Sequence, residues 1–310
     1  MTWSDLLRDA QTRLLGGMPA ETAANMRQEA RQLLSWISEK SIAWLQAHGD
    51  EEACADIASA FLHAADRRAG REPMAYITGH AGFYGHDFEV GPATLIPRPD
   101  TELLVEKVSL FLDGMSDEMC AHDAVSKSND LSLPFSPRPC RVLDVGTGSG
   151  CIPISLVLEH PLLQAVSIDI SPDALRIAKR NADRLGVADR IDFRLADVLV
   201  EDSPGEWPLY DVIVSNPPYI PSADIPALMP EVACHEPKAA LDGGPDGLLF
   251  YRRLLLLSCR LLRPGGLLAV EIGYDQGDAV PALFRKAGFV PQLFRDVGGQ
   301  PRVVLGIRPD

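Results

Sequence analysis

The sequence predicts an α/β fold in which a mostly parallel sheet is covered by helices on both faces, with a smaller helical module ahead of it. From Cys140 onward, short β-branched and apolar segments alternate with amphipathic segments, and this alternation is typical of parallel sheets. Residues 1 to about 70 instead carry apolar side chains at helical spacing. Trp3, Leu6 and Ala10 are one example of this stripe.

The chain is expected to have three parts. Residues 1–75 predict an N-terminal helical domain, a candidate for docking a substrate. Residues 76–98 predict a β-hairpin and hinge, because glycines separate aromatic and β-branched residues in YITGHAGFYGHDFEV and the proline-rich LIPRP follows. Residues 99–310 form the main domain, whose first helix is TELLVEKVSLFL with Thr101 as its N-cap. Within it, residues 114–139 lack periodicity and collect Ser, Asp, Asn and Pro, which predicts a flexible surface insertion.

The strands of the main domain can be read in order. They are RVLDV, AVSIDI, IDFRLA, DVIVS and LLAVEI, followed by a pair near FVPQLF and VVLGI. Helical patterns at 151–159, 172–185, 245–262 and 275–287 accompany these strands. No helix separates the last two strands, so we expect an antiparallel hairpin at the edge of the sheet.

Composition narrows the class of protein. The formal net charge is −14, which argues against a chain whose main task is to grip a phosphate backbone. The six cysteines form no CxxC pair and no Cys/His ligand spacing, so we expect free thiols in a reducing compartment and no metal site. No signal peptide or membrane span is visible. We therefore expect a soluble cytoplasmic protein.

A glycine-rich turn, LDVGTGSGC, follows the first strand and opens a helix. Such a turn brings backbone close to a ligand and aims free N–H groups at it. A dinucleotide loop would need a third glycine where Cys151 stands. Asp144 precedes the turn, Asp169 ends the second strand and suits ribose hydroxyls, and Asp197 ends the third, where an adenine amino group can be read. Three acids would repel a pyrophosphate, so S-adenosylmethionine is the candidate cofactor.

The fourth strand ends in an elbow, DVIVSNPPY. A planar –NH₂ group is a poor nucleophile, and two acceptors that grip its N–H bonds would orient it and stabilise its developing positive charge. Asn216 offers a side-chain carbonyl and Pro217 a backbone carbonyl. Pro218 brings no competing N–H, and Tyr219 offers a flat wall. The predicted catalytic residues are Asn216, Pro217 and Tyr219, with no general base; an amide and an exocyclic base amine both fit as acceptor.

These motifs together resemble the HemK/PrmC family, the protein-(glutamine-N5) methyltransferases of peptide chain release factors. The resemblance covers essentially the whole chain, through REPMAYITG, FYGHDFEV, LIPRPDTELLVE, VLDVGTGSGCI, DISPDAL, VSNPPYI, EPKAALDGGPDG, LRPGGLLAVEIG and the closing Asp296–Gly299–Arg302 spacing. It implies a seven-stranded class I S-adenosylmethionine-dependent methyltransferase domain with an antiparallel edge strand, joined by the hairpin to the helical domain. The implied substrate is the glutamine of a Gly-Gly-Gln loop in release factors.

The resemblance also assigns the site. Cofactor positions are Gly146, Thr147, Gly148, Ser149, Gly150, Asp169, Asp197, Val198 and Asn216, and glutamine positions are Asn216, Pro217, Pro218 and Tyr219. Asp100 departs from the family's usual Glu. A ribosomal-protein glutamine methyltransferase with the same pocket stays open. A DNA or RNA exocyclic-amine methyltransferase is disfavoured, because it must flip a base and hold the strand despite the acidic charge. We expect a monomer without nucleic-acid or membrane partners.

Overall fold

The structure is a computed structural model that describes residues 1–16, 23–125, 139–200 and 207–309. The chain forms two compact units. The first comprises Met1–His80 and Leu228–Glu236, and the second comprises Ala81–Ala227 and Pro237–Asp310.

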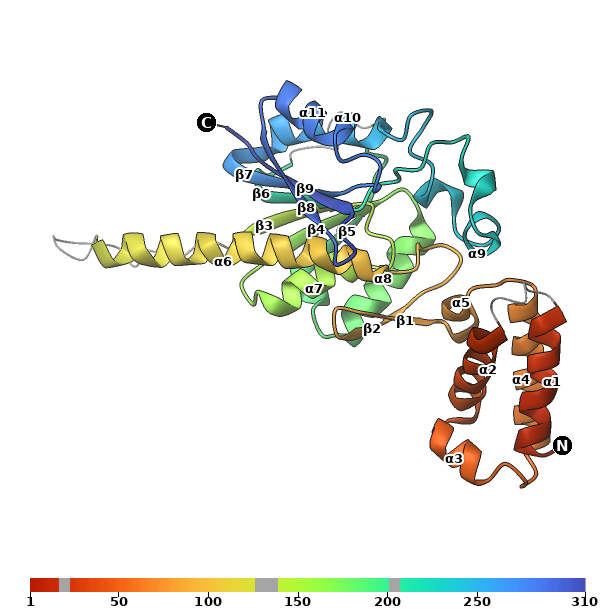
Figure 1. Cartoon of the computed structure of the whole chain (residues 1–310). Helices are drawn as coiled ribbons and strands as arrows, with labels where there is room; N and C mark the ends of the chain where they lie inside the picture. The colour runs from red at the N-terminus through yellow and green to blue at the C-terminus, as the bar shows by residue number, and fades with distance from the viewer. Residues whose placement is uncertain (17–22, 126–138, 201–206, 310) are drawn as a thin grey trace. The chain divides into compact units, whose positions relative to one another are not determined.

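The first unit is a helical bundle (Figure 1). Its helices are α1 (Trp3–Gly16), α2 (Ala23–Ser38), α3 (Ile42–Ala47), α4 (Ala55–Ala69), α5 (Met74–Thr78) and α9 (Pro230–Ala233). Helices α1, α2 and α4 pack on one another, and Leu6, Leu14, Leu33 and Phe61 are fully or almost fully buried between them. The apolar stripes in the first 70 residues therefore form the core of the predicted helical domain.

The first unit is discontinuous, which the sequence analysis did not anticipate. We placed Leu228–Glu236 in the main domain, but this segment packs with the helical bundle. Glu231 accepts from Arg68 at 3.2 Å and from Arg71 at 2.6 Å, and Arg68 also pairs with Glu29 at 2.7 Å. Because Arg68 is buried, its charge needs these partners. Pairing between such distant positions leaves no periodic signal in the sequence.

The second unit begins with the predicted hairpin. Strands β1 (His80–Phe83) and β2 (His86–Glu89) form a two-stranded sheet. Tyr84 and Gly85 both have positive φ, 49° and 74°, as a two-residue type I′ turn requires. The hairpin expected from alternating glycine and aromatic residues is confirmed.

The main sheet of the second unit has seven strands in the order β5-β4-β3-β6-β7-β9-β8. The strands are β3 (Arg141–Val145), β4 (Gln164–Asp169), β5 (Ile191–Leu195), β6 (Tyr210–Ser215), β7 (Leu262–Glu271), β8 (Val290–Arg295) and β9 (Pro301–Ile307). Strands β3 to β7 pair in parallel, whereas β9 is antiparallel to β7 and to β8. The predicted parallel sheet with an antiparallel edge hairpin is confirmed.

Helices cover both faces of this sheet (Figure 1). Helices α6 (Glu102–Val125), α7 (Cys151–Glu159) and α8 (Pro172–Arg184) lie on one face, and α10 (Leu249–Leu261) and α11 (Ala279–Lys286) lie on the other. Short 3₁₀ helices span Pro99–Thr101, Ala188–Arg190, Ile225–Ala227 and Lys238–Ala240. In β6, Val212 and Val214 face the first layer and Ile213 faces the second. This double burial explains why DVIVS shows no polar alternation.

Two expectations about the start of α6 and its length were wrong. The helix continues to Val125, so residues 114–125 are helical; Gly114 is the only glycine or proline between 102 and 125, and nothing else breaks the helix. The remainder of the expected insertion lies mostly at 126–138, outside the described residues. Thr101 does not cap α6, because it belongs to the preceding 3₁₀ helix and its hydroxyl bonds to Glu271. Among the described helices, none combines the length and apolar character needed to cross a membrane.

Candidate active site

A pocket of about 610 Å³ opens at the carboxyl ends of β3, β4 and β6. The chain turns to opposite sides of β3 to make β4 and β6, and such a switch point is where open α/β sheets bind ligands. Ten predicted site residues line it, namely Gly146, Thr147, Gly148, Ser149, Asp169, Asp197, Val198, Asn216, Pro217 and Pro218. Gly150 and Tyr219 do not line it.

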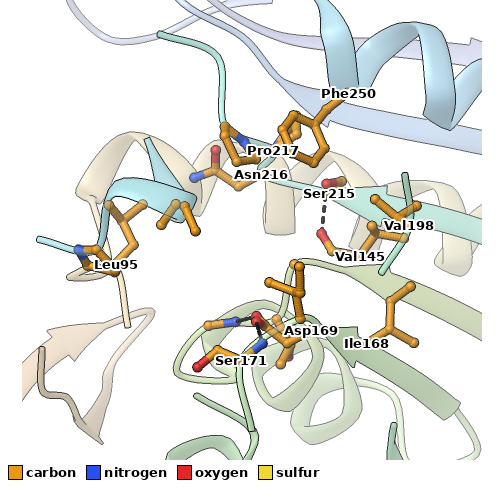
Figure 2. Close-up of a pocket in the computed structure, with 18 of the residues that line it drawn as sticks. Leu95, Val145, Ile168, Asp169, Ser171, Val198, Ser215, Asn216, Pro217 and Phe250 are labelled. Carbon is orange, nitrogen blue, oxygen red and sulfur yellow. Dashed lines mark hydrogen bonds between the residues drawn. The ribbon is translucent and has the colours of Figure 1, made fainter. Parts of the chain in front are cut away.

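Strand β6 holds Asn216 and Pro217 at the pocket (Figure 2). The Ser215 hydroxyl donates to the Val145 carbonyl at 2.7 Å, which ties the end of β6 to β3. The Asn216 amide nitrogen donates to Thr101 Oγ1 at 3.1 Å. With its nitrogen engaged there, the side-chain oxygen of Asn216 is the end that can accept a hydrogen bond from a ligand.

Asp169 ends β4, and both of its oxygens are engaged (Figure 2). Oδ2 accepts from the Gly148 N–H and Oδ1 from the Ser171 N–H, each at 2.9 Å. Burial raises the pKa of Asp169 above its usual value, and the backbone hydrogen bonds oppose this shift. Each carboxylate oxygen keeps a further lone pair, so Asp169 can still accept from a ribose hydroxyl while it fixes the glycine loop.

The glycine loop differs from expectation in one respect, because most of its N–H groups are engaged within the protein. Gly146 and Thr147 donate to the Ile168 carbonyl, at 2.9 and 3.1 Å, and Gly148 donates to Asp169. These three amides are therefore not available to bind an anion. Gly146 and Gly148 have positive φ, and a Cβ on either would meet nothing within 4 Å. A side chain there would occupy the open space of the pocket.

Gly150 has a packing role. A Cβ there would lie 2.9 Å from Ile154 Cδ1 and 3.1 Å from Ala178 Cβ, and its φ is +82°. Glycine at this position lets α7 pack closely on α8. Its assignment to the cofactor remains a prediction that the lining of the pocket does not support.

Unpaired polar groups gather around the loop. Thr147 Oγ1 and Ser149 Oγ line the pocket and lack a well-formed hydrogen bond within the described residues. Both oxygens of the fully buried Asp144 are likewise unbonded. Burial raises the pKa of Asp144 to about 7; the hydroxyls of Thr147 and Ser167 oppose this increase but do not reach good hydrogen-bond geometry. A buried acid beneath the loop favours a cationic ligand.

Tyr219 lies outside the pocket lining and packs against the core between the sheet and α10. Burial raises the pKa of its phenol to about 12, so the phenol stays neutral. Gln276 Nε2 donates to the carbonyls of Tyr219 and Gly247, each at 3.1 Å. These bonds fix the backbone after the prolines. The flat wall predicted for Tyr219 remains a prediction.

Two residues that the sequence analysis did not assign to the site lie behind Asn216. The Thr101 hydroxyl donates to Glu271 Oε2 at 2.6 Å, and both side chains are buried. Burial raises the pKa of Glu271 to about 7, while nearby Arg302 opposes the shift. Asp100, shorter than the family's usual Glu, still reaches Arg302 at 3.3 Å. Thr101 is part of the hinge motif LIPRPDTE and could have been proposed from it. No rule of sequence spacing predicts that Thr101 contacts Glu271.

The residues present fit S-adenosylmethionine. The open space at Gly146 and Gly148 admits the ligand, and Ile168 and Phe250 add apolar walls for a flat base. Asp169 and Asp197 offer carboxylates at the same pocket. The engaged loop amides and buried Asp144 disfavour a pyrophosphate and suit a sulfonium. Within the described part of the chain, no group of three or more His, Cys, Asp or Glu is placed to hold a metal ion.

Comparisons with known proteins agree with this geometry. Residues 138–286 match the family described as "Methyltransferase domain", and residues 5–79 match "PrmC N-terminal domain". The chain is 41% identical to a release factor glutamine methyltransferase of Moorella thermoacetica over 313 residues, covering 99% of each chain. It is 37% identical to that of Koribacter versatilis, over 98% of this chain and 99% of the relative. The catalytic domain of hMettl16 has the same fold, with a TM-score of 0.51, 15% identity and 83% coverage of each chain.

Proposed function

The chain belongs to the release factor glutamine methyltransferases, S-adenosylmethionine-dependent enzymes, and from this premise we propose which atom it methylates and how. The acceptor is the side-chain amide nitrogen, N5, of the glutamine in a Gly-Gly-Gln loop of a release factor. One observation supports the proposal above all others. Asn216 and Pro217 line the same pocket as the glycine loop and Asp169, so an amide acceptor and the methyl donor can meet there.

The pocket holds the donor through residues that the fold already fixes. S-adenosylmethionine supplies an electrophilic methyl group on a sulfonium sulfur. Asp169 accepts from the ribose, and Asp197 and Val198 contact the adenine from the end of β5. Arg253 Nε donates to the Val198 carbonyl at 2.6 Å, which fixes this wall. Gly146 and Gly148 leave room for the rest of the ligand.

Asn216 and Pro217 hold the acceptor. The Asn216 oxygen and the Pro217 carbonyl accept the two N–H hydrogens of the glutamine amide and turn its nitrogen toward the methyl group. Positive charge grows on that nitrogen during transfer, so both hydrogen bonds strengthen in the transition state. The methylated amide is acidic enough to lose its proton to water, so no side chain serves as a base. Pro217 and Pro218 lack N–H groups that would compete for these acceptors.

The helical unit is the proposed docking site for the release factor. Its residues 5–79 match the PrmC N-terminal domain, and Leu228–Glu236, which follows the elbow in sequence, is part of the same unit. We propose that the protein acts as a monomer in the cytoplasm, where release factors are found, without direct nucleic-acid contacts.

A competition experiment tests the proposal. The protein is incubated with labelled S-adenosylmethionine, a release factor, ribosomal proteins and DNA, and a parallel reaction uses a release factor in which Gly-Gly-Gln is changed to Gly-Gly-Ala. We expect label in the unaltered release factor alone. Label in DNA, in ribosomal proteins, or equally in the altered factor would contradict the proposal.

A further inference from the structure

The Asn216 amide poses a problem of orientation. Its oxygen and nitrogen ends are nearly the same size, yet only the oxygen can accept the N–H of a substrate amide. If the amide were turned, its own N–H₂ would face the donors of the glutamine and repel them. Efficient transfer therefore needs a structural feature that fixes which end faces the pocket.

Three side chains that are joined by hydrogen bonds, those of Glu271, Thr101 and Asn216, fix the orientation of the amide. The number of donors and acceptors that each group has allows only one arrangement. Thr101 Oγ1 lies 2.6 Å from Glu271 Oε2 and 3.1 Å from Asn216 Nδ2. A carboxylate only accepts hydrogen bonds, so it takes the single hydroxyl hydrogen of Thr101. The Thr101 oxygen can then only accept, and the end of the Asn216 amide beside it must be the nitrogen. Glu271 and Thr101 are 1% and 2% exposed, so water does not compete.

We propose that Thr101 and Glu271 are positioning residues for methyl transfer, because they hold the Asn216 oxygen toward the substrate amide. This inference rests on the proposed function. It extends that function beyond the elbow, to the hinge and to the end of β7.

Rigid elements place the three residues. Ser215 pairs with Val270 where β6 and β7 run in parallel, so Asn216 and Glu271 occupy successive positions at the ends of these strands. Thr101 lies at the end of the 3₁₀ helix that leads into α6. The Tyr251 hydroxyl donates to the backbone carbonyl of Glu271 at 3.0 Å. The hydrogen-bonded chain Glu271–Thr101–Asn216, called the relay below, is therefore fixed to the sheet.

The relay needs an ionised Glu271, which makes it sensitive to pH. Burial raises the pKa of Glu271 to about 7, and the charge of Asp100 adds to this shift. The hydrogen bond from Thr101, the charge of Arg302 on β9 and the side chain of Asn216 oppose it. The other titratable groups facing Glu271 are Tyr219, Tyr251 and Cys151, whose pKa values are themselves raised by burial, so they remain neutral near pH 7. A protonated Glu271 can donate to the Thr101 oxygen, and the hydroxyl hydrogen can then turn to Asn216. The orientation is lost as the pH falls through the pKa of Glu271.

Substitutions at Thr101 test the relay. Thr101→Val keeps the shape and removes the hydroxyl, and we expect kcat to fall roughly 5- to 100-fold. We expect KM for the release factor to change much less, and the cofactor Kd in calorimetry to change less than about 3-fold. Thr101→Ser restores a hydroxyl and should recover most of the lost rate.

Ser109→Ala is the matched control. Ser109 lies on α6, which follows the 3₁₀ helix of Thr101. Like Thr101 it is buried and donates to a carboxylate, that of Glu159, but it does not line the pocket. The Ser109→Ala substitution should lower the unfolding temperature but should not lower kcat. Equal rates for Thr101→Val and the wild-type protein, or equal losses for Thr101→Val and Ser109→Ala, would overturn the inference.

The pH profile of Glu271→Gln gives an independent readout. At saturating cofactor, kcat of the wild-type protein should fall about tenfold per pH unit below about pH 7. Glutamine can both donate and accept, so Glu271→Gln should have a lower plateau and lack this acid limb. If Glu271→Gln had the wild-type kcat and still lost activity below about pH 7, the relay would be contradicted. If the wild-type protein does not methylate the release factor, the proposed function itself fails; if it does and the variants match it, only the relay fails.

Discussion

Thr101 Oγ1 donates to Glu271 Oε2 at 2.6 Å, although 170 positions separate the two residues in sequence. The same hydroxyl oxygen accepts from Asn216 at 3.1 Å. The hinge segment LIPRPDTE is thereby joined to the ends of β6 and β7. A motif that looks like a connector in the sequence is part of the support of the acceptor site.

Asn216→Ala should lower kcat by at least about 100-fold, the cost of removing one preorganised hydrogen-bond partner from a developing charge. The cofactor should still bind within a few-fold of wild-type affinity, because Asp169 and the glycine loop are unchanged. Methyl transfer assays and calorimetry on the same preparation check both statements. Turnover at the wild-type rate would show that the Asn216 oxygen does not hold the acceptor.

Asp169→Asn should weaken cofactor binding about tenfold. An amide can accept at one end only, so it leaves either the Gly148 N–H or the Ser171 N–H facing another donor and offers a poorer acceptor to the ribose. Asp173→Asn is the control, because Asp173 is an exposed acid on α8 paired with Arg176. Unchanged affinity of the Asp169 variant in calorimetry would remove Asp169 from the ribose role.

Asp144→Asn should stabilise the protein at high pH. Folding raises the pKa of Asp144 from 3.8 to about 7, so the wild-type protein loses stability as the pH rises from about 4 to about 7 and the buried charge forms. The neutral variant escapes this loss, and its advantage should grow across that window to about 2–4 kcal/mol above pH 7. Chemical denaturation at pH 5 and pH 8 without cofactor measures it. An advantage independent of pH would exclude this cause.

Gly247→Ala should displace the backbone at Tyr219, the last residue of the NPPY elbow. A Cβ at Gly247 would lie 2.4 Å from the Tyr219 carbonyl oxygen, and its φ is +69°. Gly265 is the matched control, with φ +73° and nothing within 4 Å of an added Cβ. Gly265→Ala should cost only the backbone strain, about 1 kcal/mol. Gly247→Ala should cost more and also slow methyl transfer. Equal stability and activity in the two variants would show that the close approach to Tyr219 does not matter.

Local patterns predicted the fold because each strand and helix carries its own signal. The centre of DVIVS, Val212 to Val214, is apolar without alternation because β6 is buried on both faces, and the missing helix between the last two strands marks the edge hairpin. The extent of α6 was missed because a helix can continue without an amphipathic stripe when no residue breaks it. The place of Leu228–Glu236 was missed because its ion pairs join distant segments.

The residues that line the pocket could be predicted from the sequence more fully than the buried residues that hold them in place. Asn216 and Asp169 stand at strand ends, where the topology of the sheet brings them together. The expectation of free N–H groups in the glycine loop was wrong for Gly146, Thr147 and Gly148, because the Ile168 carbonyl and Asp169 accept their hydrogens. Tyr219 was assigned for its flat ring and Gly150 as part of the glycine loop; neither lines the pocket, and both assignments remain predictions. The contact of Thr101 with Glu271 depends on the folded sheet.

The most direct test of the account is to locate the transferred methyl group. A release factor is methylated by the purified protein. Tandem mass spectrometry of the peptide with the Gly-Gly-Gln loop then identifies the side chain that carries the methyl group. We expect one added methyl on the glutamine side chain, with none after reaction with the Asn216→Ala variant. A methyl group on another residue of the release factor, or on glutamine after reaction with that variant at the wild-type rate, would contradict it.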